Sequence, residues 1–323
     1  MNGTWRSGQR TVNGMTTAAA RWRPQREVEI VAGTPPGGGL DRTARALARA
    51  IESERLLDVP LKVVNIAGDG ARKAWAYVER RAGDPHVLAI SSPNLATDHL
   101  VGLAAFDHSA FTPLAILYNE YLAFIAAAVS PIQSARDLLQ RFAAPASEVR
   151  VAFSTALGNP NHIALAKVIR HAGGDVTRPK IRVFDSALDA LADALAGNAE
   201  VAAVTAASAV DALNAGTARA LAISAPSRLA SPYEATPTWK EQAVDCVIGA
   251  WRGITGPHGL SAEQVAYWEK ILRAAVASVA WSAELRRHHW TAMYLDGPEL
   301  AAHLQREEGE MSAVLRELGL LRG

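Results

Sequence analysis

Short apolar runs alternate with amphipathic helical patterns along most of this 323-residue chain, and this alternation constrains the fold more than any other feature. The first run, Val28 to Ala32, leads through Pro35 and three glycines into a helical pattern that begins near Asp41. Two more runs, Leu61 to Val64 and Val87 to Ile90, follow with a helical pattern between them. Strands that alternate with crossover helices form parallel sheets. The first third of the chain therefore predicts one α/β unit.

The same alternation starts again in the middle of the chain. Apolar runs at 149–153, 180–184, 201–205 and 221–224 are separated by amphipathic helical patterns, and a further run at 121–129 precedes them. The final quarter carries apolar residues at helical spacing and is predicted to be mainly helical. The sequence thus predicts two α/β units, followed by helices whose apolar faces are expected to pack on the first unit.

The amino-terminal segment differs from the rest of the chain. It contains five arginines and no acidic residue before Glu27, so residues 1–24 are predicted to be disordered or derived from an expression vector. The first domain is placed at 25–122 plus 252–323, and the second at 123–251. No apolar core of a signal peptide precedes the first strand. Either an export signal is missing from this sequence, or the protein stays in the cytoplasm.

Composition argues against several classes of function. The formal net charge is +1, so no excess of positive charge is available for nucleic acid or for an anionic membrane surface. Cys246 is the only cysteine, which leaves no intrachain disulfide and no cysteine-based metal site. No apolar run approaches the length of a membrane span. We expect no cofactor, no nucleic acid partner and a monomer.

The turn after the first strand can bind an anion. Three consecutive glycines, Gly37, Gly38 and Gly39, allow backbone N–H groups to point toward one site, and the following helix adds its unpaired N–H groups. The spacing matches neither a dinucleotide fingerprint nor a phosphate loop, and a strand-to-helix turn without a ligand explains these residues equally well. An acid beside a bound anion is unfavourable, so Asp41 is predicted to cap its helix and hold the turn.

Small polar residues also follow other predicted strands. They are Ser91, Ser92 and Asn94 in the first half, and Ser154, Thr155, Ser186 and Thr205 in the second. Ligands of open α/β sheets gather at the carboxyl ends of the strands. Each cluster taken alone could be a solvated turn. Two such edges facing each other would form a cleft rich in hydrogen-bond donors.

The chain also contains a series of short motifs. They are Pro36, Gly37 and Gly38 with Asp41, Ala44 and Arg45; Val63, Asn65 and Gly68; Asp84; Ser154, Gly158 and His162; Pro237, Thr238 and Glu241; and Trp251 with Gly253. In order and spacing these residues resemble the extracytoplasmic solute receptors of tripartite tricarboxylate transport systems, the TctC-like or Bordetella uptake gene receptors. The resemblance extends from about residue 25 to the end of the chain.

The resemblance implies an α/β fold of the two-domain, periplasmic-binding-protein type. Each domain would have a mixed, mostly parallel sheet flanked by helices, with the ligand cleft between the domains. The protein would capture a small organic acid and deliver it to membrane transporter subunits, which implies a periplasmic location. In the family, the carboxylate is held by backbone N–H groups, hydroxyls and water rather than by arginine.

The residue pattern and the resemblance together define the predicted ligand-binding residues. They are Pro36, Gly37, Gly38, Gly39, Asp41, Ser91, Ser92, Asn94, Ser154, Thr155, Gly158, His162, Phe184, Asp185, Ser186 and Thr205. His162 could bond a ligand carboxylate, or could pack at a helix start with its ring bonded to the backbone, and the second interpretation is favoured. Trp251 is expected to pack at the hinge.

One segment departs from the family pattern. Where these receptors usually have Pro-Tyr-Lys-Gly, this chain has Val183, Phe184, Asp185 and Ser186. If Asp185 faces the cleft, it would repel a distal carboxylate on the ligand and favour a monocarboxylate, an amino acid or an aromatic acid. If it caps the next helix, which is the favoured interpretation, nothing follows for the ligand.

Two other classes of function remain open. An enzyme acting on an organic acid would need a nucleophile with a base, a pair of carboxylates or a metal cluster. Ser154 and His162 are too loosely spaced to predict a dyad, and neither Gly-x-Ser-x-Gly nor His-Glu-x-x-His occurs. A cytoplasmic or signalling carboxylate sensor of the same fold would account for the missing export signal.

Overall fold

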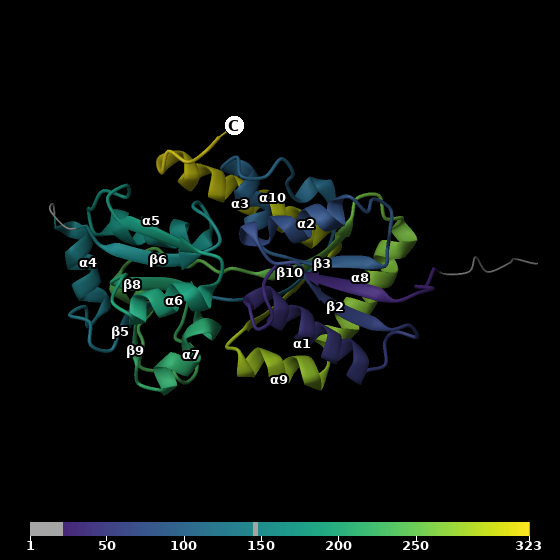
Figure 1. The fold of residues 1–323 in the computed structure, drawn as a ribbon, viewed down its shortest axis with the longest axis horizontal. Coiled ribbons are helices and arrows are strands. Elements are labelled where there is room, and N and C mark those ends of the chain that lie inside the picture. The colour runs from purple at the N-terminus through teal and green to yellow at the C-terminus, as the bar shows by residue number, and fades with distance from the viewer. Residues whose placement is uncertain (1–21, 145–147, 323) are drawn as a thin grey trace, which may run out of the picture.

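The computed structural model describes residues 22–144 and 148–322, which form two lobes (Figure 1). The first lobe contains a six-stranded sheet with the order β11-β4-β10-β3-β1-β2. Its strands are β1 (Val28–Ala32), β2 (Leu61–Asn65), β3 (Val87–Ser91), β4 (Phe111–Asn119), β10 (Arg252–Pro257) and β11 (Thr291–Leu295). β1 pairs in parallel with β2 and β3, whereas β10 and β11 pair antiparallel with their neighbours, so this sheet is mixed.

The second lobe contains a five-stranded sheet with the order β7-β6-β8-β5-β9. Its strands are β5 (Leu122–Ala127), β6 (Arg150–Ser154), β7 (Lys180–Phe184), β8 (Val201–Thr205) and β9 (Ala218–Ile223). β6 pairs in parallel with β7 and β8, and β5 pairs antiparallel with β8 and β9. The predicted two-domain α/β fold with mixed sheets is therefore confirmed.

Helices flank both sheets and bury their apolar faces against them. In the first lobe they are α1 (Gly39–Ser53), α2 (Arg72–Glu79), α3 (Asn94–Leu100), α8 (Ala262–Val276), α9 (Val279–Arg287) and α10 (Gly297–Glu317); in the second, α4 (Ala135–Ala143), α5 (Pro160–His171), α6 (Ala187–Leu195) and α7 (Ala206–Asn214). Leu47 of α1 and Trp268 of α8 are fully buried in the first core, and Phe124 and Trp239 in the second. Each lobe thus has its own apolar core.

Five elements are missing from the sequence-based prediction: α3, α9, β4, β10 and β11. β10 is fully buried and carries Gly253, Gly256 and Pro257, so it shows neither alternation nor a composition rich in β-branched residues. The final quarter is mainly helical, as predicted, but it also contributes β10 and β11 to the first sheet. α9 is a separate helix that begins at Val279 after the cap residue Ser278, and Val279 is 81% exposed.

The chain crosses between the sheets along two neighbouring segments. The first crossover joins β4 to β5, and the second joins β9 to β10. They are bridged at Tyr121 and Gly249, and the Ala250 N–H donates to the Glu120 carbonyl at 2.7 Å. We propose that these segments form the hinge and mark the domain boundaries.

α10 contacts both lobes (Figure 1). Leu304 packs with Trp251 at the second crossover. Nearer the end of the helix, Met311 and Leu315 pack with Ile163 of α5, which belongs to the second lobe. The apolar face of α10 was expected to pack on the first domain, but it also holds the second.

Glu307 of α10 gives this contact a pH dependence. Trp251 Nε1 donates to Glu307 Oε2 at 2.6 Å, and burial raises the pKa of Glu307 from its ordinary value of 4.5 to about 7. The folded protein therefore binds a proton that the unfolded chain releases, and this group lowers stability as pH rises from 4.5 to about 7. Glu307→Gln should flatten this part of the profile of unfolding free energy against pH, measured by denaturant titration.

Glu299→Gln serves as the control for Glu307→Gln, because Glu299 is an exposed acid on the same helix. Its pH profile should match that of the wild-type protein. Equal profiles for Glu307→Gln and the wild-type protein would contradict this role of Glu307.

The segment before β1 is only partly described. The prediction for residues 1–24 lies outside the described residues as far as residue 21. Trp22 is described, and its ring packs edge-on against Tyr267 with 5.1 Å between centroids. In the described ranges, no helix is both long and apolar enough to cross a membrane.

Candidate functional site

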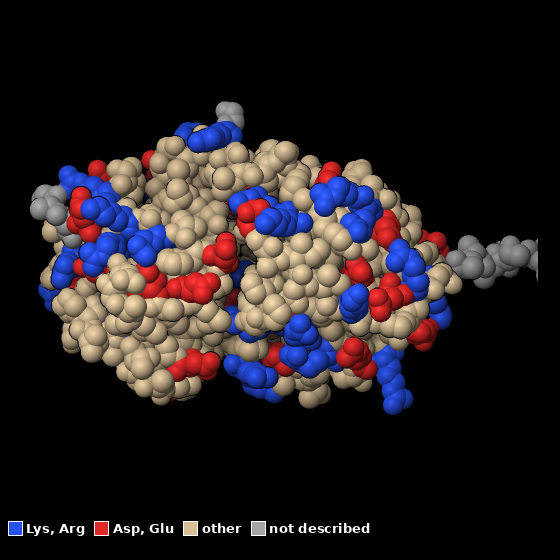
Figure 2. Space-filling view, in the orientation of Figure 1, with Lys and Arg blue, Asp and Glu red and all other residues tan. Residues whose placement is uncertain are grey.

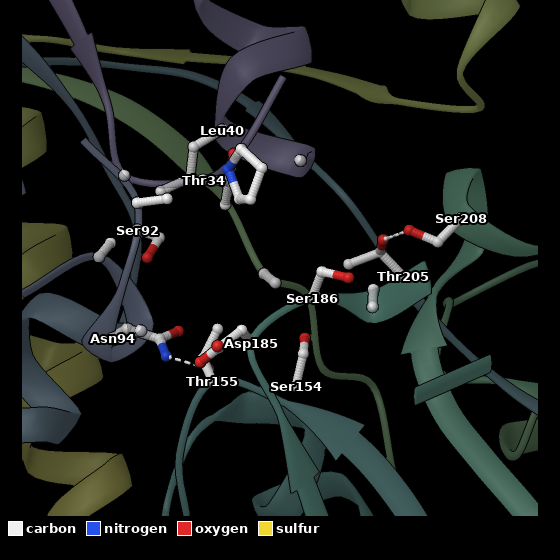
Figure 3. A pocket seen from close by; sticks show the side chains of 18 of the residues that line it. Thr34, Leu40, Ser92, Asn94, Ser154, Thr155, Asp185, Ser186, Thr205 and Ser208 are labelled. Carbon is white, nitrogen blue, oxygen red and sulfur yellow. Dashed lines mark hydrogen bonds between the residues drawn. The ribbon is translucent and has the colours of Figure 1, made fainter. Parts of the chain in front are cut away.

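A cavity of about 310 Å³ lies between the two lobes. Its walls are formed by residues after β1, β2 and β3 in the first lobe and after β6, β7 and β8 in the second (Figure 3). These are the carboxyl ends of the parallel strands, where ligands of open α/β sheets bind. The predicted cleft between two polar sheet edges is therefore present.

The glycine turn offers the cavity different N–H groups from those predicted. The Gly37 N–H donates to Asp41 Oδ2 at 2.8 Å, and the Gly38 N–H donates to the Pro35 carbonyl at 3.0 Å. Within the described part of the chain, the N–H groups of Gly39 and Leu40 have no hydrogen-bond partner, and both residues line the cavity. The free donors at the start of α1 are thus those of Gly39 and Leu40, not those of Gly37 and Gly38.

Asp41 holds this turn in place. Its buried carboxylate accepts from the Gly37 N–H, from Asn65 Nδ2 at 2.8 Å and from Arg45 Nε at 2.9 Å. Burial raises the pKa of Asp41, but these hydrogen bonds together outweigh burial and lower it below its ordinary value. The prediction that Asp41 fixes the turn is confirmed. The prediction that it caps the helix is wrong, because Gly38 is the cap residue and Asp41 is the third residue of α1.

The loop after β6 forms the opposite wall. Thr155 adopts a φ of 82°, a left-handed conformation that is unfavourable for a β-branched residue and is often found at ligand sites. Its N–H donates to the Phe184 carbonyl at 2.8 Å, and its hydroxyl accepts from Asn94 Nδ2 of the first lobe at 2.6 Å. Among the described residues, the hydroxyls of Ser92 and Ser154 have no hydrogen-bond partner and face this space (Figure 3). Free donors thus lie on both sides of the cavity.

Half of the predicted ligand-binding residues line the cavity. Those that do are Gly39, Ser92, Asn94, Ser154, Thr155, Asp185, Ser186 and Thr205. Those outside its lining are Pro36, Gly37, Gly38, Asp41, Ser91, Gly158, His162 and Phe184. Several of the second group support a residue of the first, since Asp41 positions the turn before Gly39 and the Phe184 carbonyl accepts from Thr155.

Gly158 and His162 support the loop from behind. The Gly158 N–H donates to His162 Nδ1 at 3.0 Å, and the His162 ring stacks on Phe153. Burial lowers the pKa of His162 to about 4, so the ring is neutral at pH 7 and Nδ1 can accept. The favoured interpretation of His162, a packed ring bonded to the backbone, is confirmed.

Asp185 lines the cavity and does not cap α6. The cap residue is Ser186, whose hydroxyl accepts from the Asp189 N–H at 3.1 Å. Asp185 is exposed and stands beside Thr155 at the cavity wall (Figure 3). The favoured cap interpretation of Asp185 is therefore wrong.

Sequence reasoning missed several lining residues. They are Gly33, Thr34, Pro35, Leu40, Ala67, Gly68, Gly70, Ala71, Asn161, Ala187, Ser208, Ala250 and Arg252. Thr34 and Ser208 flank predicted strand ends, so the same strand-end rule could have found them. Arg252 follows Trp251 in the Trp-x-Gly motif, where nothing in the residue pattern signals that a side chain reaches the cavity.

Charged side chains of both signs lie on the surface, and two charged residues line the cavity. Both signs are interspersed over the face shown in Figure 2, in keeping with the formal net charge of +1. Of the charged residues, Asp185 and Arg252 line the cavity. Residues 22–144 and 148–322 contain no group of three or more His, Cys, Asp or Glu side chains that could hold a metal ion.

Comparisons with known proteins agree with this geometry. A family model described as tripartite tricarboxylate transporter family receptor, TctC, matches residues 44–320. The protein BugT of Bordetella pertussis is 22% identical over 303 residues, which cover 92% of this chain and 90% of BugT. A crystal structure of a TctC solute binding protein from Polaromonas superposes with a TM-score of 0.67 at 27% identity, covering 91% of this chain and 99% of that one.

A second solved structure, a Rhodopseudomonas palustris protein with adipate, superposes with a TM-score of 0.82 at 20% identity and covers 92% of this chain and 98% of that one. This likeness supports the fold. The family match spans most of the chain, so the chain belongs to the TctC family of tripartite tricarboxylate transporter receptors.

Proposed function

We propose that this protein is a periplasmic solute-binding receptor that captures a small organic acid between its two domains and delivers it, as a monomer, to the membrane subunits of a tripartite transporter. The observation that carries this proposal is the cavity between the lobes. It presents the N–H groups of Gly39 and Leu40, which have no partner among the described residues, together with the hydroxyls of Ser92 and Ser154. The family to which the chain belongs supports a receptor rather than an enzyme.

In this proposal the carboxylate binds at the start of α1. Two adjacent N–H groups at a helix N-terminus suit two carboxylate oxygens, and the helix dipole favours their charge. The Ser154 hydroxyl would donate from the second lobe and thereby favour the closed arrangement. Hydrogen bonds to a charged group contribute about 1.5–3 kcal/mol each, so three or four could offset the cost of association.

Asp185 narrows the class of ligand. It lines the cavity, so a second carboxylate placed beside it would be repelled. We therefore propose a ligand whose far end is neutral or cationic, such as an aliphatic or aromatic monocarboxylate or an amino acid. The adipate in the R. palustris structure shares the carboxylate but carries a second one.

A thermal-denaturation panel tests the proposal. The panel consists of hexanoate, benzoate, glutamine, malate, adipate and citrate, measured with the full chain. We expect at least one monocarboxylate or amino acid to raise the melting temperature, and to raise it more than citrate does. No stabilisation by any member, together with turnover of one, would favour an enzyme and refute the receptor.

Ser154→Ala tests the second wall of the site. Loss of one hydroxyl donor to a carboxylate should weaken binding about tenfold, as measured by calorimetric titration with the panel member that stabilises most. Ser227→Ala is the matched control, because Ser227 is an exposed serine that does not line the cavity. The affinity of this variant for the same acid should equal that of the wild-type protein. Equal affinities for the two variants would remove Ser154 from the site.

A further inference from the structure

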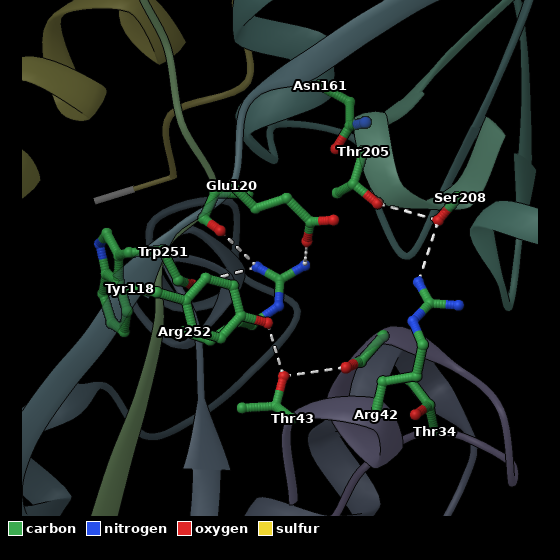
Figure 4. A network of polar contacts seen from close by, with 12 residues as sticks. Thr34, Arg42, Thr43, Tyr118, Glu120, Asn161, Thr205, Ser208, Trp251 and Arg252 are labelled. Atoms are coloured by element: carbon green, nitrogen blue, oxygen red, sulfur yellow. Dashed lines mark hydrogen bonds and ion pairs between the residues drawn. The ribbon is translucent and has the colours of Figure 1, made fainter. Parts of the chain in front are cut away.

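Arg252 lies where the second crossover meets the cavity. It is the first residue of β10, it is only 9% exposed, and it lines the cavity (Figure 4). A buried cation in a hinge is costly unless other groups compensate its charge. The hydrogen-bond partners of its guanidinium therefore decide what the residue can do.

Two N–H donors of the Arg252 guanidinium have no hydrogen-bond partner among the described residues. Nη1 donates to the carbonyls of Ala250 and Trp251 at 2.8 and 3.1 Å, and Nη2 donates to Glu120 Oε2 at 3.4 Å. An arginine has five N–H donors, so these bonds account for three of them. Among the described residues, Nε has no hydrogen-bond partner, and the second N–H of Nη2 has none either.

Glu120 compensates this charge incompletely. It is buried on the first crossover, and its contact with Nη2 is longer than a normal charge-assisted bond. Its other oxygen, Oε1, has no partner in the described part of the chain. The ion pair between Glu120 and Arg252 is therefore weak. Because both side chains are buried, an acceptor with better geometry would be strongly attracted to Arg252.

Nη2 also lies beside the free N–H groups of α1. A Cβ atom on Gly39 would stand 3.8 Å from Nη2. The Gly39 carbonyl accepts from the Thr43 hydroxyl, which contacts the Tyr118 hydroxyl of β4 at 2.7 Å (Figure 4). This network fixes Gly39 relative to the sheet that carries Arg252. The guanidinium and the start of α1 thus face one region of the cavity.

We propose that Arg252 binds the ligand carboxylate together with the N–H groups of Gly39 and Leu40, and that Glu120 competes with the ligand for Nη2. This inference rests on the proposed function, and it departs from the arginine-free carboxylate site that the family resemblance implied. Nη1 would stay bonded to the second crossover, whereas the ligand would take the place of Glu120, so binding would loosen a contact between the two hinge segments.

Two variants and matched acid and amide probes test this role. The probes are hexanoate with hexanamide and benzoate with benzamide, titrated calorimetrically against the full chain. Arg252→Lys keeps the charge but loses the planar fork, and should weaken acid binding about tenfold or more while leaving amide binding within about twofold. Glu120→Gln removes the competitor and should tighten acid binding about threefold or more.

The ratio of acid to amide affinity separates the possible outcomes. A purely structural Arg252 would make acid and amide affinity fall together in both variants, and that result would overturn the inference. If Arg252→Lys does not fold, Glu120→Gln alone decides, and an unchanged ratio of acid to amide affinity would overturn the inference. If the wild-type protein binds no panel member or probe, the proposed function itself fails.

Discussion

Asp41→Ala is expected to lower the free energy of unfolding by about 3 kcal/mol and to reduce affinity for the panel acids by at least about tenfold. The substitution removes the acceptor of the Gly37 N–H, one of the two acceptors of Asn65 Nδ2 and the carboxylate that pairs with Arg45. The turn then loses the contacts that set the direction of the Gly39 and Leu40 N–H groups. Denaturant titration and calorimetric titration measure the two effects.

The contribution of Asp41 should depend on pH with a definite sign. Its pKa is lowered in the folded protein, so its stabilisation is present above the ordinary value of 3.8 and is lost as pH falls below it. The difference in stability between the wild-type protein and Asp41→Ala should therefore shrink in acid. Asp211→Ala is the control, because Asp211 is an exposed acid on α7. If the two variants behaved alike, Asp41 would not hold the turn.

Gly158→Ala should have the second large effect. Gly158 has a φ of +86°, and a Cβ there would come within 2.6 Å of Val101 Cγ1 and 3.0 Å of Leu315 Cδ2. The substitution combines backbone strain with overpacking between the lobes, and should cost about 3 kcal/mol of stability. Because Val101 and Leu315 belong to the first lobe, relief of the clash moves the lobes apart and weakens acid binding.

Gly173→Ala tests the effect of backbone strain without a steric clash. Gly173 follows the other end of α5 with a φ of +75°, and a Cβ there would meet no atom within 4 Å. It should cost only about 1 kcal/mol and leave acid affinity unchanged. Equal losses of stability and affinity in the two variants would mean that close packing at Gly158 plays no part.

The sequence predicted the parallel half of each sheet well, because those strands are short apolar runs followed by polar turns and amphipathic helices. β1 and β6 were placed within a residue of their observed bounds. The antiparallel additions were harder. β4 and β10 are joined to their neighbours only by long-range pairing, and the glycines of β10 carry no strand signal.

The site was predictable where strand ends defined it. Ser154 and Thr205 end β6 and β8, and both line the cavity. Which N–H groups of the turn are free could not be predicted. The answer for Gly37 and Leu40 depends on which N–H group the Asp41 carboxylate accepts from. Arg252 reaches the cavity because the two crossovers lie side by side. This is a tertiary contact, which the local sequence pattern does not predict.

The most direct test of the carboxylate site is a crystal structure of the protein grown with the panel acid that stabilises it most. The predicted result is a carboxylate in the cavity, with its oxygens roughly 3 Å from the Gly39 and Leu40 N–H groups and within reach of the Ser154 hydroxyl. An acid bound outside this cavity, or bound with its carboxylate beside Asp185, would contradict the account.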